Sequence, residues 1–483
     1  MGAHPSTREQ KLMVVREGKR WKDWAPVFVT YALLGVILVW VLRGAVGQAA
    51  DGATTDSGGR IALVVIGLIT AITLAIRSIK IRGAVWLAWV PPIATGSIIL
   101  GLWVLVLSGR DAIAWSAYAG VQVLRGRVPF ADADWVLRWF DCDFCERWDP
   151  HYGPALAWLD PIFGGTLGLS WAPWIAIVTL AGLCASVFVL AKVSAPRGVL
   201  VLIIASVGPA WLLMSDRINV DAPILIIAVL GAVFASRANT LWAWSILAIA
   251  LWIMGTWKYF PFPMAVGLLP VVLIKRGWMI LVAFIAMTAG YMWWARSAFM
   301  DSSKWNTETI LVLQDFPAYG RLQVLDRMSV STANPTLVLV ASGLLILFTL
   351  AAIWWGANWG LRISAPSTLS IMLALVGTTA FLGTVLISGF GFMYKGAFLL
   401  LAVPLLAQGR NGAKGFVLFT SLLSLSLLTV SVMVAYSTLL VTLCGLMASG
   451  LAFGAAATGM FRLWKSREVG SLTVVGQPKA ERR

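Results

Sequence analysis

Polar residues gather in a few short groups of an otherwise apolar sequence, and the first of them could supply a base. Asp111 directly follows a long apolar run. A carboxylate at the end of a membrane span can act as a general base toward a hydroxyl. The alternative is a structural role, in which Asp111 caps a helix beginning at Ala112 by accepting hydrogen bonds from its free N–H groups.

The segment 148–154, with the sequence Trp-Asp-Pro-His-Tyr-Gly-Pro, is aromatic, polar and turn-forming. Its prolines and glycine favour a rigid turn. Aromatic faces beside hydrogen-bonding groups suit a sugar, and the candidates are Asp149, His151 and Tyr152. An aromatic belt at the membrane surface is the alternative interpretation.

A third group, the segment 215–221 with the sequence Ser-Asp-Arg-Ile-Asn-Val-Asp, places three charges and an amide between two apolar runs. The guanidinium of Arg217 could bind a phosphate through two parallel hydrogen bonds. Asp216, Asn219 and Asp221 are further candidates for binding a substrate. The alternative is a turn in which the Asp and Arg side chains satisfy each other.

Other cations lie further along the chain. Lys258 could bind a phosphate or pyrophosphate headgroup, or could snorkel to the surface from an aromatic belt, and Tyr259 beside it is a further candidate for binding the substrate. Arg321 and Arg327, in a long polar loop that could cover a site, are further candidates for binding the donor phosphate.

Two cysteines, Cys142 and Cys145, form a Cys-Asp-Phe-Cys pair in a segment expected outside the cytoplasm. Oxidation is permitted there, so a local disulfide is the leading interpretation. A zinc site with His151 and a carboxylate is the alternative, although its ligand set is incomplete.

The composition shows which solvent surrounds these groups. Hydrophobic residues make up 59% of the 483 residues, charged residues 12%, and the mean hydropathy is +0.85. Soluble proteins carry about a quarter charged residues, so lipid must surround most of this chain. The apolar runs are too long for barrel strands, and helices are expected. The net charge of +16 does not indicate nucleic-acid binding, because Lys and Arg lie in short clusters between apolar runs.

The sequence therefore predicts an all-α polytopic membrane protein with about 14 transmembrane helices. The membrane domain is expected over residues 26–464. The basic N-tail before it, residues 1–25, and the C-tail after it, residues 465–483, are both expected in the cytoplasm. Two long loops, about 109–170 and 296–334, are then extracytoplasmic. The expected helices cover residues 26–43, 61–76, 84–107, 171–191, 198–214, 221–236, 240–256, 259–274, 277–295, 335–355, 367–388, 395–408, 415–434 and 436–460.

An ordered series of these motifs resembles the GT-C glycosyltransferases of family 87. Asp111 leads to Leu124-Arg125-Gly126-Arg127-Val128-Pro129-Phe130, which is similar to the family's Leu-x-Gly-x-Pro-Tyr pattern. Tyr152-Gly153-Pro154 is similar to its Tyr-Gly-Pro element, and the segment 216–221 to Asp-Arg-Gly-Asn-x-Asp. Lys258-Tyr259-x-Pro261 is similar to its Lys-x-x-Pro element. The likeness covers about 105–280. Ile218 departs from it by standing where glycine is usual, and two extra spans precede Asp111.

This resemblance implies a transferase that uses a polyprenyl-phosphate sugar as donor and inverts the sugar carbon. It assigns the base to Asp111 and the phosphate-binding cations to Arg217 and Lys258. The partners would be a membrane lipid donor and a glycolipid or polysaccharide acceptor in the cell envelope. It implies no nucleotide or redox cofactor, and it leaves a divalent metal open. The competing class is a polytopic transporter or lipid flippase, which should have charges at mid-membrane and paired broken helices.

Overall fold

The helical elements of the chain are known from a computed structural model. It describes residues 87–107, 155, 172–206, 208, 210–211, 214–215, 218, 220–275, 277–299, 318–319, 335–360, 363, 366–388, 391–408, 416, 418–420, 422–423 and 434–475. The predicted spans 26–43 and 61–76 lie outside these residues, as does most of 415–434.

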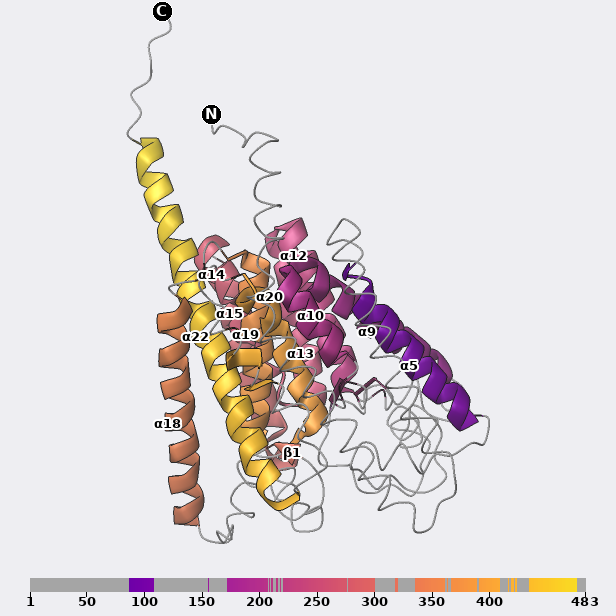
Figure 1. Ribbon diagram of the computed structural model, residues 1–483. Helices are drawn as coiled ribbons and strands as arrows, with labels where there is room; N and C mark the ends of the chain where they lie inside the picture. Colours follow the sequence, from indigo (N-terminus) through magenta and orange to yellow (C-terminus); the bar gives the residue numbers. More distant parts are fainter. Residues whose placement is uncertain are drawn as a thin grey trace, which may run out of the picture.

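Most of the remaining predicted spans coincide with helices (Figure 1). The helix over the expected span 198–214 is shorter than predicted, and the last helix runs on into the predicted C-tail. The α-helices are α5 (Val90–Leu107), α9 (Ala172–Val193), α10 (Pro196–Ala205), α12 (Asp221–Ala238), α13 (Leu241–Trp257), α14 (Leu269–Lys275), α15 (Trp278–Trp294), α18 (Pro335–Gly360), α19 (Thr368–Leu382), α20 (Val403–Leu406) and α22 (Val434–Val475).

In the described part of the chain, five helices are long and apolar enough to cross a membrane. Large apolar side chains also point outward from the peripheral helices. Val178 on α9, Met279 on α15 and Leu339 on α18 are 70%, 67% and 74% exposed. Water would disfavour such a surface, whereas lipid tails match it. The protein is therefore a helical membrane protein, and its total of about 14 spans stays a prediction.

Three predicted spans are not plain α-helices. The expected helix 259–274 begins with the 3₁₀-helix η3 (Phe262–Leu268), and 395–408 with the 3₁₀-helix η5 (Met393–Ala402). The span 367–388 ends in the π-helix η4 (Gly383–Ser388). Pro261 caps η3 and Pro263 lies in its first turn, where a proline is tolerated because the missing N–H would have no partner within the helix. Such irregular turns are frequent at functional sites.

A short antiparallel ladder joins two distant segments. β1 (Ala318–Tyr319), from the predicted loop 296–334, pairs with β2 (Gly391–Phe392), between η4 and η5. Ala318 lies opposite Phe392, and Tyr319 opposite Gly391. The second long loop is therefore attached next to the start of η5.

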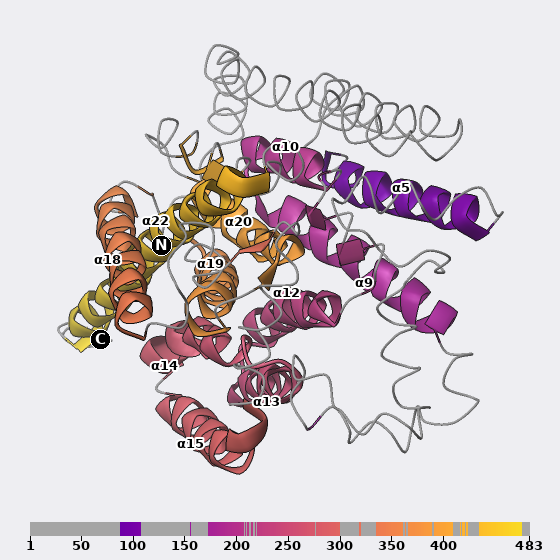
Figure 2. The same ribbon diagram turned by 90° about the horizontal axis from the view of Figure 1, so that it is seen from below.

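The core is built around α19, which lies in the middle of the bundle (Figure 2). Its residues from Ser370 to Phe381 are buried, and it packs against α12, α22, η3 and η5. The α18 and α22 helices lie side by side at one edge, and α5 and α9 at the other (Figure 1). All of this packing places the start of α12, the end of α13 and the start of η5 around one end of α19.

Candidate charged site at one end of the helices

A tight hairpin brings the first two charged residues of the site together. α12 ends at Ala238 and is capped by Asn239, whose left-handed φ of 52° is one that asparagine tolerates, and α13 begins two residues after this cap at Leu241. The two helices pack against each other. Because they run in opposite directions, Asp221 at the start of α12 lies beside Lys258, which follows the end of α13.

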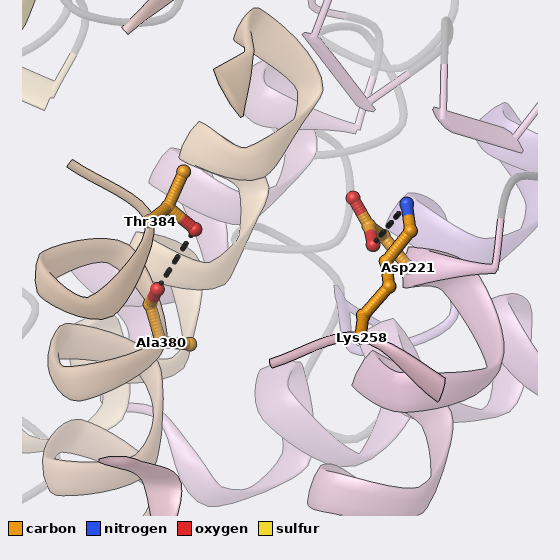
Figure 3. A network of polar contacts seen from close by, with 4 residues as sticks. All are labelled: Asp221, Lys258, Ala380 and Thr384. Atoms are coloured by element: carbon orange, nitrogen blue, oxygen red, sulfur yellow. Dashed lines mark hydrogen bonds and ion pairs between the residues drawn. The ribbon is translucent and has the colours of Figure 1, made fainter. Parts of the chain in front are cut away.

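Lys258 and Asp221 form a buried ion pair (Figure 3). The Lys258 Nζ donates a hydrogen bond to the Asp221 Oδ1 at 3.0 Å, and the two residues are 7% and 0% exposed. The helix dipoles favour this arrangement, since a carboxylate lies at the N-terminus of α12 and an ammonium at the C-terminus of α13. Lys258 therefore does not snorkel, and much of its charge is already balanced.

A third charged residue, Lys395, reaches the same site from η5. It is 8% exposed, and its Nζ lies 4.2 Å from the centre of the Phe260 ring. The Asp221 carboxylate attracts its ammonium and the Lys258 ammonium repels it. Phe260 is held in turn by an edge-on contact with Phe398, with 5.4 Å between ring centres. Sequence reasoning missed Lys395, although a lone lysine in an apolar span is by itself a sign of function.

The backbone that leads into Asp221 is strained. Ile218 has a φ of 51° and is 3% exposed. A β-branched residue in this left-handed region is a genuine outlier and costs about 1–3 kcal/mol, whereas glycine adopts the conformation freely. Position 218 is where the family pattern has glycine. The side chain departs from that pattern, but the backbone has the conformation that a glycine serves.

Aromatic residues border the charged site on the side of α15. Tyr259 makes an edge-on contact with Phe299, with 5.0 Å between ring centres. The Tyr291 hydroxyl donates a hydrogen bond of 2.7 Å to the Thr256 carbonyl, which fastens α15 to the last turn of α13. Fully buried Ala155 packs in this cluster. It directly follows Tyr152-Gly153-Pro154 in the sequence, so the first long loop also reaches this end of the helices.

The structure thus unites Asp221, Lys258 and Tyr259, which the sequence singled out in two separate motifs. The other candidates lie outside the described residues: Asp111, Cys142, Cys145, Asp149, His151, Tyr152, Asp216, Arg217, Asn219, Arg321 and Arg327. The disulfide and zinc interpretations of the cysteines both stay open. Within the described ranges no three His, Cys, Asp or Glu residues gather as metal ligands.

A scan against protein-family models and searches of curated proteins and of solved structures found no match to this chain. The chemistry of the site is therefore inferred from its own residues. Among the described side chains, the two buried ammonium groups of Lys258 and Lys395 lie near one carboxylate, that of Asp221, to which Lys258 is hydrogen-bonded. A buried excess of positive charge favours the binding of an anion.

Proposed function

We propose that the protein is a membrane glycosyltransferase of the GT-C type, similar to family 87. It would move a hexose or pentose from a polyprenyl-phosphate donor to an extracytoplasmic glycolipid or polysaccharide in the cell envelope. The observation that carries this proposal is the buried cationic site formed by Asp221, Lys258 and Lys395. It lies at the helix ends that the charge distribution assigns to the outside, where Ala155 and β1 bring in both long loops.

The proposed reaction needs a base on one side of the sugar and cations on the other. The donor would enter from the bilayer with its phosphate at the cations. Asp111 would remove the proton of the acceptor hydroxyl, whose oxygen then bonds to the anomeric carbon from the face opposite the phosphate. The bond from that carbon to the phosphate oxygen breaks, and the polyprenyl phosphate leaves with the electron pair. Preorganised cations stabilise this developing charge.

The conformation of Ile218 gives separate support to the family resemblance. The pattern Asp-Arg-Gly-Asn-x-Asp has glycine where this chain has Ile218, and the φ of 51° there is one that glycine prefers. Arg217 and Asn219, which flank Ile218 in the sequence, would correspond to the Arg and Asn of the family's pattern. Arg217 would assist the donor phosphate, with Arg321 and Arg327 as further cations near it.

The experiment that tests the function replaces Asp111 by Asn. Asparagine caps a helix about as well as aspartate but cannot accept a proton as a base. In a strain that lacks the protein, the wild-type gene should restore an envelope glycan that mass spectrometry detects, and Asp111→Asn should not. In vitro, release of polyprenyl phosphate should fall about a hundredfold or more at unchanged thermal stability. Activity within a few fold of wild type would remove Asp111 as the base and direct attention to Asp141, Asp143, Asp149 and His151.

A polytopic transporter or lipid flippase is the second candidate, and the interrupted helices favour it. The irregular elements η3 and η5 both adjoin the buried charges, as broken helices do in many transporters. Proteoliposomes loaded with a labelled polyprenyl-phosphate sugar would separate the two functions. Movement of the intact lipid between leaflets, with no sugar transferred to any acceptor, would identify a flippase.

A further inference from the structure

The charged site contains an imbalance that the family resemblance does not account for. Lys258 already has a partner, because the Asp221 carboxylate lies 3.0 Å from its ammonium. Lys395 is equally buried, at 8% exposure; its close contact is the face of the Phe260 ring, and the attraction of Asp221 for its ammonium is opposed by the repulsion of Lys258. A ring face compensates an ammonium far less than a carboxylate does. Lys395 is thus the cation in the described site whose charge is least balanced.

The elements around Lys395 fix the position of its side chain, as a preorganised binding site requires. Its irregular helix η5 starts next to the β1–β2 ladder and packs along α19. Phe260, under its ammonium, is 2% exposed and contacts Phe398, which lies in η5 itself. The ammonium is therefore fixed by its surroundings before any ligand arrives, which lowers the entropy lost on binding.

We infer that Lys395 is the residue that binds the phosphate oxyanion, and that the Asp221–Lys258 pair positions the site beside it. The recognised chemistry is a phosphate group. If the proposed glycosyltransferase function holds, this group is the phosphate of an isoprenoid lipid. Only this identification of the ligand rests on the proposed function; the binding of a phosphate group does not. The pair fixes the end of α13 and hence Phe260, which supports the ammonium of Lys395.

The test measures binding of two probes to the purified full-length protein in nanodiscs, namely a short-chain isoprenyl phosphate and inorganic phosphate. The isoprenyl phosphate should bind wild type, and Lys395→Gln should weaken this binding at least about tenfold, as loss of a buried charged hydrogen bond does. Lys395→Arg, which keeps the charge, should retain part of the affinity. Binding of inorganic phosphate with the same dependence on Lys395 would identify free phosphate as the source.

Matched controls keep the result interpretable. Lys192, at the end of α9, also lies over an aromatic ring, 5.9 Å from the centre of Phe188, but its side chain is exposed. Lys192→Gln should leave binding unchanged. If Lys395→Gln does not fold, Lys395→Met supplies an apolar side chain of similar length for the same measurement.

The inference would be overturned if wild type bound neither probe, or if Lys395→Gln bound the isoprenyl phosphate as tightly as wild type. Sugar transfer that persists while Lys395→Gln binds normally would refute the role of Lys395 and leave the glycosyltransferase proposal intact. If binding depends on Lys395 but the protein has no transferase activity, the role of Lys395 stands and the glycosyltransferase proposal is refuted.

Discussion

Two buried regions of this protein are held together by opposite kinds of interaction. The charged site joins α12, α13 and η5 through Asp221, Lys258 and Lys395. The contact between α18 and α22 is formed by small residues: a Cβ on Gly454 would meet the Ile353 carbonyl oxygen and lie 2.5 Å from the Ala357 nitrogen. We call this contact the glycine seam.

The difference between the two regions indicates that the glycine seam serves the assembly of the helices and the charged site serves function. Lipid tails are as apolar as leucine, so helices in a membrane associate through close packing, and the glycine seam is sufficient for this purpose. Buried charges lose their hydration and give little net stability in return. A membrane protein can do without them in its core, which makes the charged site the region where a function is to be sought.

Breaking the ion pair should have the largest effect on stability. Lys258→Met removes the ammonium that lies 3.0 Å from the buried Asp221 carboxylate, and breaking a buried ion pair in this way typically costs about 3–5 kcal/mol. Adding Asp221→Leu removes the carboxylate as well and should restore part of the loss, because the buried Lys395 ammonium then loses the carboxylate that attracts it. Unfolding of the purified variants in detergent measures both effects. If the single variant were as stable as wild type, the pair would not be a structural element of the site.

Disturbing the glycine seam should have the next largest effect. Gly454→Ala places a methyl group against the backbone of α18, and such overpacking costs about 1–3 kcal/mol. Gly343→Ala is the control, because a Cβ there has nothing within 4 Å, so this variant should be neutral or slightly stabilising. Thermal unfolding of the two variants should therefore differ in sign. Binding of an isoprenyl phosphate to the folded fraction of Gly454→Ala should be unchanged, which an effect on the charged site would contradict.

The sequence predicted the individual residues of the site better than their partners. Asp221 and Lys258 stood out because charged residues beside apolar runs are rare, yet they belonged to different motifs. Their pairing depends on the closure of the α12–α13 hairpin, for which the short connection around Asn239 was the available signal. Lys395 began an expected span, and its partner Phe260 comes from another part of the chain, so no local pattern showed the contact.

The limits on predicting the fold have similar physical causes. Hydropathy located α9, α12, α13, α15 and α18 well, because long apolar runs in lipid have to form helices. It did not distinguish η3, η4 and η5 from α-helices, since that difference lies in hydrogen bonding. The Thr384 hydroxyl, for example, donates to the Ala380 carbonyl at 3.0 Å where α19 gives way to η4 (Figure 3). Gly450 and Gly454 of α22 both face α18 and lie four residues apart in the sequence, but that spacing does not show which helix packs against them.

The strained turn before Asp221 allows a sharper test. The difference in stability between a glycine variant and an alanine variant should have opposite signs at Ile218 and at Ile224. Glycine is about 1 kcal/mol worse than alanine inside a helix, but it is favoured where φ is positive. Ile218→Gly should therefore be more stable than Ile218→Ala by about 1 kcal/mol. At Ile224, which is buried in α12, the order should reverse. Denaturant unfolding of the four variants gives both differences, and an alanine variant more stable than the glycine variant at position 218 would show that Ile218 is not strained.

The smallest predicted effect distinguishes two tyrosines at the border of the charged site. Tyr291→Phe removes the 2.7 Å hydrogen bond to the Thr256 carbonyl and should cost about 0.5–1.5 kcal/mol of stability. The buried Tyr259 hydroxyl has no hydrogen-bond partner among the described residues, so Tyr259→Phe should be neutral or slightly stabilising. Tyr259 is a sequence candidate for substrate binding. If its hydroxyl contacts the sugar part of the donor, the same variant should weaken binding of an isoprenyl-phosphate sugar but not of the isoprenyl phosphate alone. Equal loss of stability in both variants would mean that Tyr259 has a structural partner, and would place it with the packing of α13 and α15 instead of the substrate.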